Sequence, residues 1–281
     1  MFEDDRAMNS PSISAVIASN STPALVAWWR GAGRRVKAPL LHALASLGVA
    51  ITVSVIVFLL WFPGALATVA GGATLFMILT TVDVISGPLM TAVVADPAKP
   101  ARSFRRDVLV IAIVQLVALA YGVYVLSLAR PVVLVFEVDR MRVLSAAEID
   151  PAELGKAPDE LRKLSWTGPR VIAAAQPTTR EEKLKAIDLA IGGLDIGDLP
   201  KNWRPYESQA TSAWNRAKPA PELEARYPSI RGELTAVAAR THVPLEELRF
   251  LPLIGRQSSG SVILAPPGAR VVDVLSVDGF L

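Results

Sequence analysis

The stretch LLHALASLGVAITVSVIVFLLWF, residues 40–62, is long and apolar, and two further apolar stretches follow it at residues 65–94 and 108–128. A helix of about 20 residues crosses the roughly 30 Å of hydrocarbon in a bilayer. Each stretch reaches this length, and only the middle one carries a full charge, at Asp83. We therefore predict an α-helical membrane anchor of three transmembrane helices surrounded by the lipid bilayer, within a region spanning residues 38–129.

The rest of the chain, residues 130–281, has the composition of a water-soluble domain. It holds 20 Lys and Arg against 20 Asp and Glu, so the net charge of +3 of the whole chain belongs to the regions that flank the apolar stretches. A balanced domain implies no basic surface for nucleic acid. We therefore predict no nucleic-acid partner.

The orientation follows from the cations beside the apolar stretches, because Lys and Arg are retained on the cytoplasmic side of a membrane. The turn Pro63-Gly64 is uncharged, whereas the other two flanks are basic, with Arg30, Arg34, Arg35 and Lys37 before the first stretch and Lys99, Arg102, Arg105 and Arg106 before the third. This pattern predicts a bacterial inner-membrane protein with a cytoplasmic N terminus and a periplasmic domain at 130–281. Residues 1–37, rich in Ser, Asn, Ala and Pro, are interpreted as a disordered cytoplasmic tail, unless translation starts further down.

Asp83 is the notable residue within the membrane, because it lies close to the middle of its stretch. A charge at that depth is costly and faces other helices. Gln115 and Tyr121 of the third stretch bracket the same depth and could hydrogen-bond to Asp83, while Ala118 and Gly122 form a small-xxx-small pair that lets helices approach closely. These five residues are candidate contacts for a partner within the membrane. The alternative is a protonated or capped Asp83 that holds the three helices of this chain together.

The surroundings of Asp83 carry two further expectations. Pro88 removes the hydrogen bond to the carbonyl of Val84, which predicts a kink beside the acid. No second ionisable residue is expected near Asp83 within the three stretches, which argues against a proton relay.

The soluble part mixes strand and helix patterns. We predict strands at 132–138 and 170–175, a helix capped by Thr178 or Thr179 that runs to Ile191, and a short helix with a capping box formed by Ser145 and Glu148. The remaining expectations are helices at 207–217, 229–241 and 244–248 and a hairpin of 261–265 with 270–277. A mixture without a strict strand–helix alternation predicts an α+β domain.

Residue types that carry chemistry are sparse in this domain. The chain has two histidines and no cysteine, and no phosphate-binding loop or nucleophile motif is present. Asp195 and Asp198 lie on a glycine-containing loop, where carboxylates are usually solvated turn residues. We therefore predict no catalytic, cofactor-binding or metal site and no enzymatic activity. Trp203, Tyr206 and Trp214 are candidates for a periplasmic partner contact, with packing in the core as the alternative.

Several segments resemble the TfpX/TfpZ family of type IV pilin accessory proteins in order and spacing. They are Val82-Asp83-Val84-Ile85-Ser86-Gly87-Pro88-Leu89, Pro97-Ala98-Lys99-Pro100, Gln115-Leu116-Val117-Ala118-Leu119-Ala120-Tyr121-Gly122, Ala129-Arg130-Pro131-Val132, Val135-Phe136-Glu137-Val138-Asp139-Arg140, Leu251-Pro252-Leu253 with Gly255-Arg256, and Val277-Asp278-Gly279-Phe280. The resemblance covers residues 38–281. The tail has no counterpart in it, and residues 148–169 resemble nothing recognisable.

The resemblance implies a non-enzymatic inner-membrane accessory protein of type IV pilus biogenesis that contacts pilin as an assembly chaperone or modulator. It carries over no catalytic residue and no cofactor. Two other classes remain open. A membrane-anchored periplasmic enzyme would need convergent acids, a nucleophile or a metal site that the sequence does not show, whereas an envelope sensor or structural protein unrelated to pili would share the same physical features. The sequence predicts no particular oligomeric state.

Overall fold

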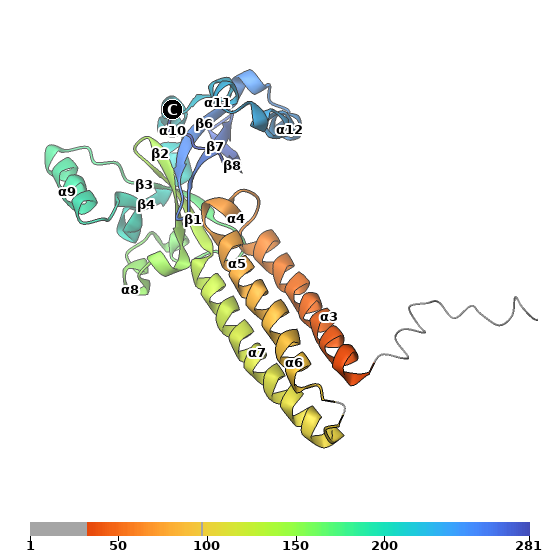
Figure 1. Ribbon diagram of the computed structural model, residues 1–281. Coiled ribbons are helices and arrows are strands. Elements are labelled where there is room, and N and C mark those ends of the chain that lie inside the picture. Colours follow the sequence, from red (N-terminus) through yellow and green to blue (C-terminus); the bar gives the residue numbers. More distant parts are fainter. Residues whose placement is uncertain (1–32, 97) are drawn as a thin grey trace, which may run out of the picture.

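The computed structural model describes residues 33–96 and 98–281, as three long helices joined to a domain with a curled sheet and helices (Figure 1). The predicted fold class, three membrane-capable helices followed by a soluble α+β domain, is confirmed. Residues 1–32 of the predicted tail lie outside the described residues, and helix α3 already begins at Arg34.

In the part of the chain that the structure describes, three helical segments are long and apolar enough to cross a membrane: Val36–Trp61, Gly72–Val94 and Ala101–Ala129. Two of them contain a π-helical turn, and only the third is regular throughout. Their elements are α3 (Arg34–Val55) with a π-turn at Ile56–Trp61, α5 (Gly72–Thr81) and α6 (Gly87–Val94) with a π-turn at Val82–Ser86 between them, and α7 (Ala101–Ala129).

The second segment is shorter than the apolar stretch at 65–94 suggests. Residues 65–71 form a turn with the short helix α4 (Leu66–Val69), and Gly71 ends it with a left-handed φ of 84°. Leu66 is 4% exposed and Val69 is fully buried, because both pack against the soluble domain. Apolar composition suits lipid and a protein core equally, so it cannot separate the two environments.

The domain is built on one eight-stranded sheet in the order β4-β3-β1-β2-β6-β7-β8, with β5 paired to β6. Most neighbours are antiparallel, and β1 with β3 and β2 with β6 are parallel. The strands are β1 (Pro131–Glu137), β2 (Arg140–Ser145), β3 (Arg170–Ala174), β4 (Trp203–Pro205), β5 (Lys218–Pro219), β6 (Arg249–Ile254), β7 (Ser259–Ala265) and β8 (Arg270–Leu275).

Side chains alternate between two buried faces of this sheet, as the two-residue period of a strand requires. Leu134 and Phe136 of β1 join one core cluster, and Val133 and Val135 join another. The first cluster also contains residues of β6 and β7 together with α4 and the adjacent ends of the long helices. One sheet face therefore packs directly on the membrane-proximal turn.

Helices α8 (Pro151–Leu154), α11 (Ala220–Arg226) and α12 (Arg231–Thr241) pack on the other face. Helix α10 (Ala210–Arg216) joins the first cluster through Ala213, and α9 (Arg180–Ile191) has no buried residue. Leu223 of α11 and Leu234 of α12 pack on β6 and β7. The predicted hairpin is present as β7 with β8, and the predicted capping box forms at Ser145 with Glu148. Of the two predicted caps of α9, Thr179 is the one in place, and it forms a capping box with Glu182.

The hairpin turn between β6 and β7 is hydrogen-bonded to the end of α4. The carbonyl of Val69 accepts hydrogen bonds from the backbone N–H groups of Gln257, at 3.0 Å, and Ser258, at 3.4 Å. Gly255 allows this approach, because a Cβ there would lie 2.4 Å from the Val69 carbonyl oxygen. The close fit ties the soluble domain to the turn between the first two long helices.

Replacing Gly255 with Val should separate the soluble domain from the turn between the first two long helices. The branched side chain would meet backbone atoms that cannot move away, and overpacking of this kind costs about 3 kcal/mol. We expect a lower thermal unfolding temperature for the full chain in detergent. Gly232 in α12 is the matched control, because nothing lies within 4 Å of a Cβ there. Gly232→Ala should leave stability unchanged or raise it by about 0.5 kcal/mol. Equal unfolding temperatures of the two variants would contradict the proposed close contact between the β6–β7 turn and α4.

Candidate functional site

Asp83 occupies the centre of the second long helix, since the 23-residue segment Gly72–Val94 extends eleven residues to either side of it. It lies in the π-helical turn Val82–Ser86, directly before Gly87 and Pro88. A wider turn at this place accommodates a proline that cannot donate a backbone hydrogen bond. The irregularity predicted from Pro88 thus takes the form of a π-turn that contains the acid.

Gln115 of α7 makes the contact with Asp83 that the sequence suggested. Its side-chain amide nitrogen lies 3.0 Å from the Asp83 carbonyl oxygen and 3.3 Å from Oδ1 of the carboxyl group. Gly87 makes room, because a Cβ there would lie 2.1 Å from the Gln115 amide nitrogen. The buried Oε1 of Gln115 has no hydrogen-bond partner among the described residues. The pair therefore keeps an unused acceptor in the middle of the membrane-capable helices.

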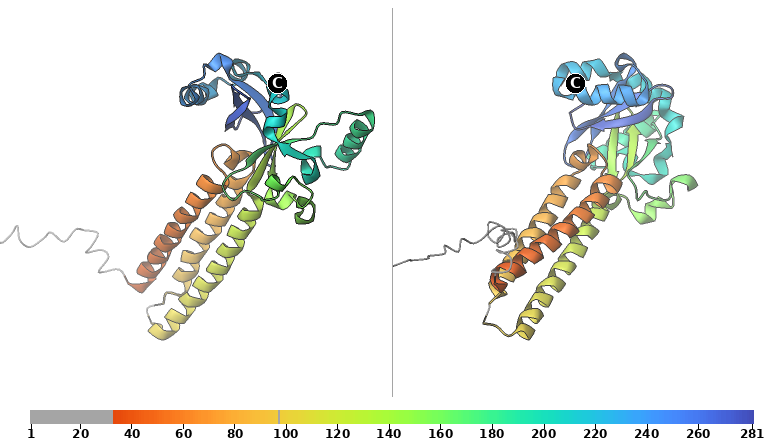
Figure 2. Two further views of the ribbon diagram at one scale, coloured as in Figure 1. Left: turned by 180° about the vertical axis from the view of Figure 1, so that it is seen from behind. Right: turned by 90° about the vertical axis from the view of Figure 1, so that its right-hand side faces the viewer.

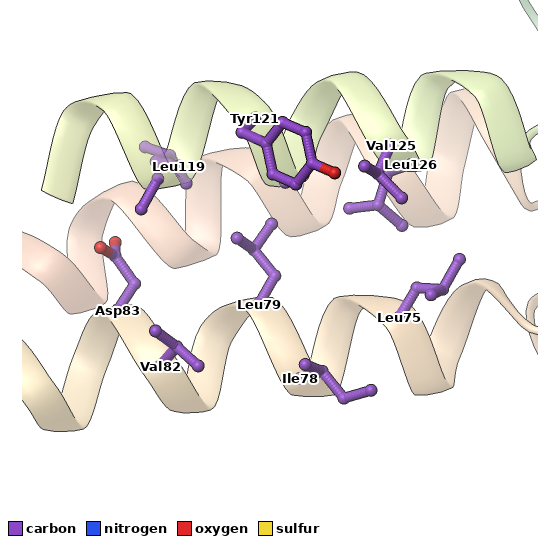
Figure 3. A pocket seen from close by; sticks show the side chains of 11 residues that line it. Leu75, Ile78, Leu79, Val82, Asp83, Leu119, Tyr121, Val125 and Leu126 are labelled. Atoms are coloured by element: carbon purple, nitrogen blue, oxygen red, sulfur yellow. The ribbon is translucent and has the colours of Figure 1, made fainter. Parts of the chain in front are cut away.

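A groove of about 240 Å³ runs between α5 and α7 beside this pair (Figure 3). Asp83 stands at one end of it, and the rest of the lining is almost entirely apolar. Ala118 and Gly122 line its α7 side, and a Cβ at Gly122 would lie 2.3 Å from a methyl group of Leu79. Small residues thus bring the helices together as predicted, and the space left between them is open to lipid or to another helix.

Tyr121 stands on the rim of this groove. Its side chain is 69% exposed, and Figure 3 shows its hydroxyl group directed along α7 away from Asp83. Tyr121 therefore does not make the expected hydrogen bond to Asp83 in the structure. Of Gln115 and Tyr121, only Gln115 contacts Asp83.

A second groove of about 180 Å³ reaches Asp83 from between α3 and α7. His42 lines it, and its Nδ1 lies 2.6 Å from the hydroxyl group of Thr91. Contrary to the expectation from the sequence, a second ionisable residue therefore shares a groove with Asp83. The sequence contained the signal, because His42 lies at the start of the first apolar stretch, but the pairing of α3 with α6 was needed to bring it near.

The three long helices bury little of one another. In their most apolar windows, only 11%, 17% and 6% of the residues are buried inside the molecule. The remaining surface faces outward and is apolar, with Leu59, Val93 and Val117 among its most exposed side chains. The helices therefore present wide surfaces to lipid or to a partner within the membrane.

Two of the three aromatic residues singled out in the soluble domain are core residues. Trp203 is 1% exposed and its indole nitrogen donates to the Gly197 carbonyl at 2.7 Å. Tyr206 is 7% exposed and its hydroxyl donates to the Ala269 carbonyl at 2.7 Å. Their side chains are not available to a partner in this conformation, which corrects the prediction of a contact patch. Trp214 is half-buried, with the Arg249 guanidinium 4.7 Å from the centre of its ring.

Helix α9 offers the exposed apolar surface that the aromatic residues do not. It stands apart from the sheet on two connecting segments in Figure 1 and in the left view of Figure 2. Leu184, Ile187 and Ile191 lie on one side of it, at helical spacing, and are 54%, 55% and 81% exposed. The sequence showed this apolar side, but a helix of this pattern is usually docked on a core. Its isolation became visible only in the structure.

A cluster of ionic side chains connects the α9 arm, which is α9 with its two connecting segments, to the sheet. Glu137 at the end of β1 accepts a hydrogen bond from the Gly197 N–H at 2.9 Å. Arg142 of β2 pairs with Asp195, and its Nε lies 3.5 Å from Oδ1 of Asp198. Asp195 and Asp198, expected to be solvated turn residues, are thus partly buried ion-pair partners. They connect the chain after α9 to the sheet.

Burial changes the acid–base properties of this cluster. Loss of hydration, followed by the nearby charge of Asp195, raises the pKa of Glu137 to about 7, against the hydrogen bond from Gly197 and the charges of Arg142 and Arg140. Burial likewise raises the pKa of Asp198. Among residues 33–96 and 98–281, no group of three or more metal-ligating side chains could hold a metal ion.

These features define a membrane protein with three membrane-capable helices and a soluble α+β domain. No protein-family model matches the chain, and no solved structure matches it. Two proteins of Dichelobacter nodosus align with 85% of this chain over 94% of their own length. They are a fimbrial assembly protein of serogroup I, 31% identical over 244 residues, and one of serogroup E1, 29% identical over 241 residues. A third, of serogroups C1 and C2, is 38% identical over 117 residues, which cover 42% of this chain and 89% of that protein. The chain belongs to this family of fimbrial assembly proteins.

The raised pKa of Glu137 predicts a pH-dependent stability. The folded state holds this proton more tightly than the unfolded state, whose value is near 4.5. The contribution of Glu137 to the free energy of unfolding therefore falls as the pH rises from about 4.5 to about 7. Glu137→Gln should stabilise the full chain relative to the natural protein more at pH 8 than at pH 4.5, by about 3 kcal/mol. Urea unfolding in detergent, followed by tryptophan fluorescence, measures the difference. A constant difference across this range would show that Glu137 does not titrate as described.

Proposed function

We propose that this protein is an inner-membrane accessory protein of type IV pilus biogenesis, of the TfpX/TfpZ kind, that contacts the pilin subunit as an assembly chaperone or modulator. Support comes from relatives named fimbrial assembly proteins that align with 85% of the chain. The observation that carries the mode of action is the groove beside Asp83, at mid-depth of the long helices. The proposed role is non-enzymatic.

A pilin waiting in the membrane presents an apolar helix in lipid and a globular head outside it, so a helper needs contacts at both levels. In this proposal the pilin helix lies in the groove between α5 and α7. Ala118 lines this groove, and Gly122 lets α5 and α7 approach closely enough to form it. Asp83, which lines this groove, favours a partner that supplies a hydrogen-bond donor at mid-membrane depth.

The contact outside the membrane is proposed for α9 rather than for Trp203 and Tyr206. The arm exposes apolar side chains that its own domain does not cover. Burying a Leu or Ile side chain on a partner contributes roughly 1.5–3 kcal/mol. The ion pairs of Arg142 with Asp195 and Asp198 fix where the arm leaves the sheet.

The proposed orientation places the domain in the periplasm. Arg102, Arg105 and Arg106 begin α7 at the end of the helices that lies away from the domain. Cations are retained on the cytoplasmic side, which supports a cytoplasmic position for that end.

Site-specific photocrosslinking in living cells tests both contacts. Tyr121 and Tyr124 are a matched pair on α7, 69% and 58% exposed, and of the two only Tyr121 lines the groove. A photoreactive residue should capture pilin at position 121 and not at position 124. On the domain, it should capture pilin at Ile187 and not at Val138, which is 42% exposed at the hairpin after β1.

The carboxyl group of Asp83 provides the second part of the same test. Asp83→Leu should reduce capture at position 121 roughly tenfold, the effect of about 1.4 kcal/mol, at equal protein level, whereas Asp83→Asn should reduce it less. Equal capture at 121 and 124 would refute the groove as the binding site. Absence of pilin from every adduct would refute the pilin partnership and favour an enzyme, a sensor or a structural protein of the envelope.

A further inference from the structure

The segment between α8 and β3 lies against the domain-side ends of the long helices. Arg130, the residue directly after α7, donates from Nε to the Ser165 carbonyl at 3.2 Å and from its guanidinium to the Ser127 carbonyl. A Cβ at Gly168 would lie 3.4 Å from the ring of Pro63, which follows the first long helix. The segment thus touches the ends of two of the three membrane-capable helices.

Trp166 is the unexpected residue of this segment, because it is 63% exposed although it is large and mostly apolar. The Arg130 guanidinium lies 3.9 Å from the centre of its ring. This contact holds the indole beside the end of α7 and leaves much of its surface uncovered. Lys163, three residues earlier, is also exposed.

We propose that residues 162–168 form an interfacial anchor that inserts Trp166 into the lipid headgroup layer on the domain side of the membrane. Tryptophan is enriched at this depth because its ring is apolar and its N–H needs a polar partner. Long cationic side chains place their charge among lipid phosphates and their carbon atoms among the glycerol and acyl groups. Trp166 and Lys163 together provide both kinds of group.

The argument for lipid as the occupant is continuity with the membrane-spanning part. The hydrocarbon layer must end near Pro63 and Arg130, where the long helices end, and the segment contacts both residues. Figures 1 and 2 show the α8 side of the domain beside the upper end of α7 in each view. The anchor would fix the tilt of the soluble domain relative to the bilayer, and this role is independent of any pilin contact.

The natural absence of cysteine allows a clean test by site-directed spin labelling of the full chain. Nitroxide labels are placed at Trp166→Cys and Thr167→Cys. Ser229→Cys, between α11 and α12, is the exposed control far from the three membrane-capable helices. The protein is reconstituted in nanodiscs of phosphatidylethanolamine and phosphatidylglycerol. Collision rates with oxygen, which is enriched in lipid, and with a water-soluble nickel chelate report the depth of each label.

The ratio of oxygen to nickel accessibility should be several-fold higher at 166 and 167 than at 229. Thr167→Cys retains Trp166 and Arg130, so its result stands even where loss of the indole disturbs the segment. A ratio at 167 equal to that at 229 would place the segment in water and overturn the proposal. Low accessibility of 167 to both reagents would mean that protein covers the segment, which would overturn it as well.

Discussion

The burial of the turn at residues 63–71 against the sheet is the contact on which the rest of the structure depends. Leu66 and Val69 of α4 share one apolar cluster with strands β1, β6 and β7 and with the adjacent ends of the long helices. The Val69 carbonyl, which would otherwise lack a partner at the end of a short helix, is satisfied by the hairpin after β6. The chain therefore has no flexible tether between its membrane and soluble parts. The domain and the long helices share one core.

This shared core gives the proposed function its geometry. A groove at the depth of Asp83 and an exposed helix on the soluble domain can act on one partner only when their separation is fixed. The direct passage from α7 through Arg130 into β1 and the seating of α4 on the same sheet supply two connections between these levels. A pilin held at both levels would be presented in one orientation, which suits an accessory role in which no bond is made or broken.

The sequence predicted the features that depend on local patterns. Three long apolar segments, the helix cap at Thr179 and the hairpin before the C terminus follow from hydrophobic period, cap residues and turn residues. The contact of Asp83 with Gln115 was also within reach, because antiparallel helices of known length place these residues at the same depth. Such predictions require only distances along the chain.

The remaining features depend on contacts between distant segments. The position of α4 was missed because its apolar residues suit lipid and a protein core equally well. The burial of Trp203 depends on Gly197, whose backbone also binds Glu137 of the first strand. The isolation of α9 could not be inferred, because an amphipathic pattern shows that a face is apolar and not whether anything covers it. For α4 and Trp203 the fold identified the deciding partner, and for α9 it showed that the apolar face is exposed.

Hydrogen exchange of the full chain in nanodiscs, followed by mass spectrometry in increasing urea, tests the shared core most directly. The amides of Gln257 and Ser258 donate to the Val69 carbonyl, so their protection reports the seating of α4. The account predicts that residues 66–71, residues 255–260 and strand β1 lose protection together, in one cooperative step. Early exchange of 66–71 and 255–260 while β1 stays protected would contradict it, and would mean that the domain is only tethered to the membrane helices.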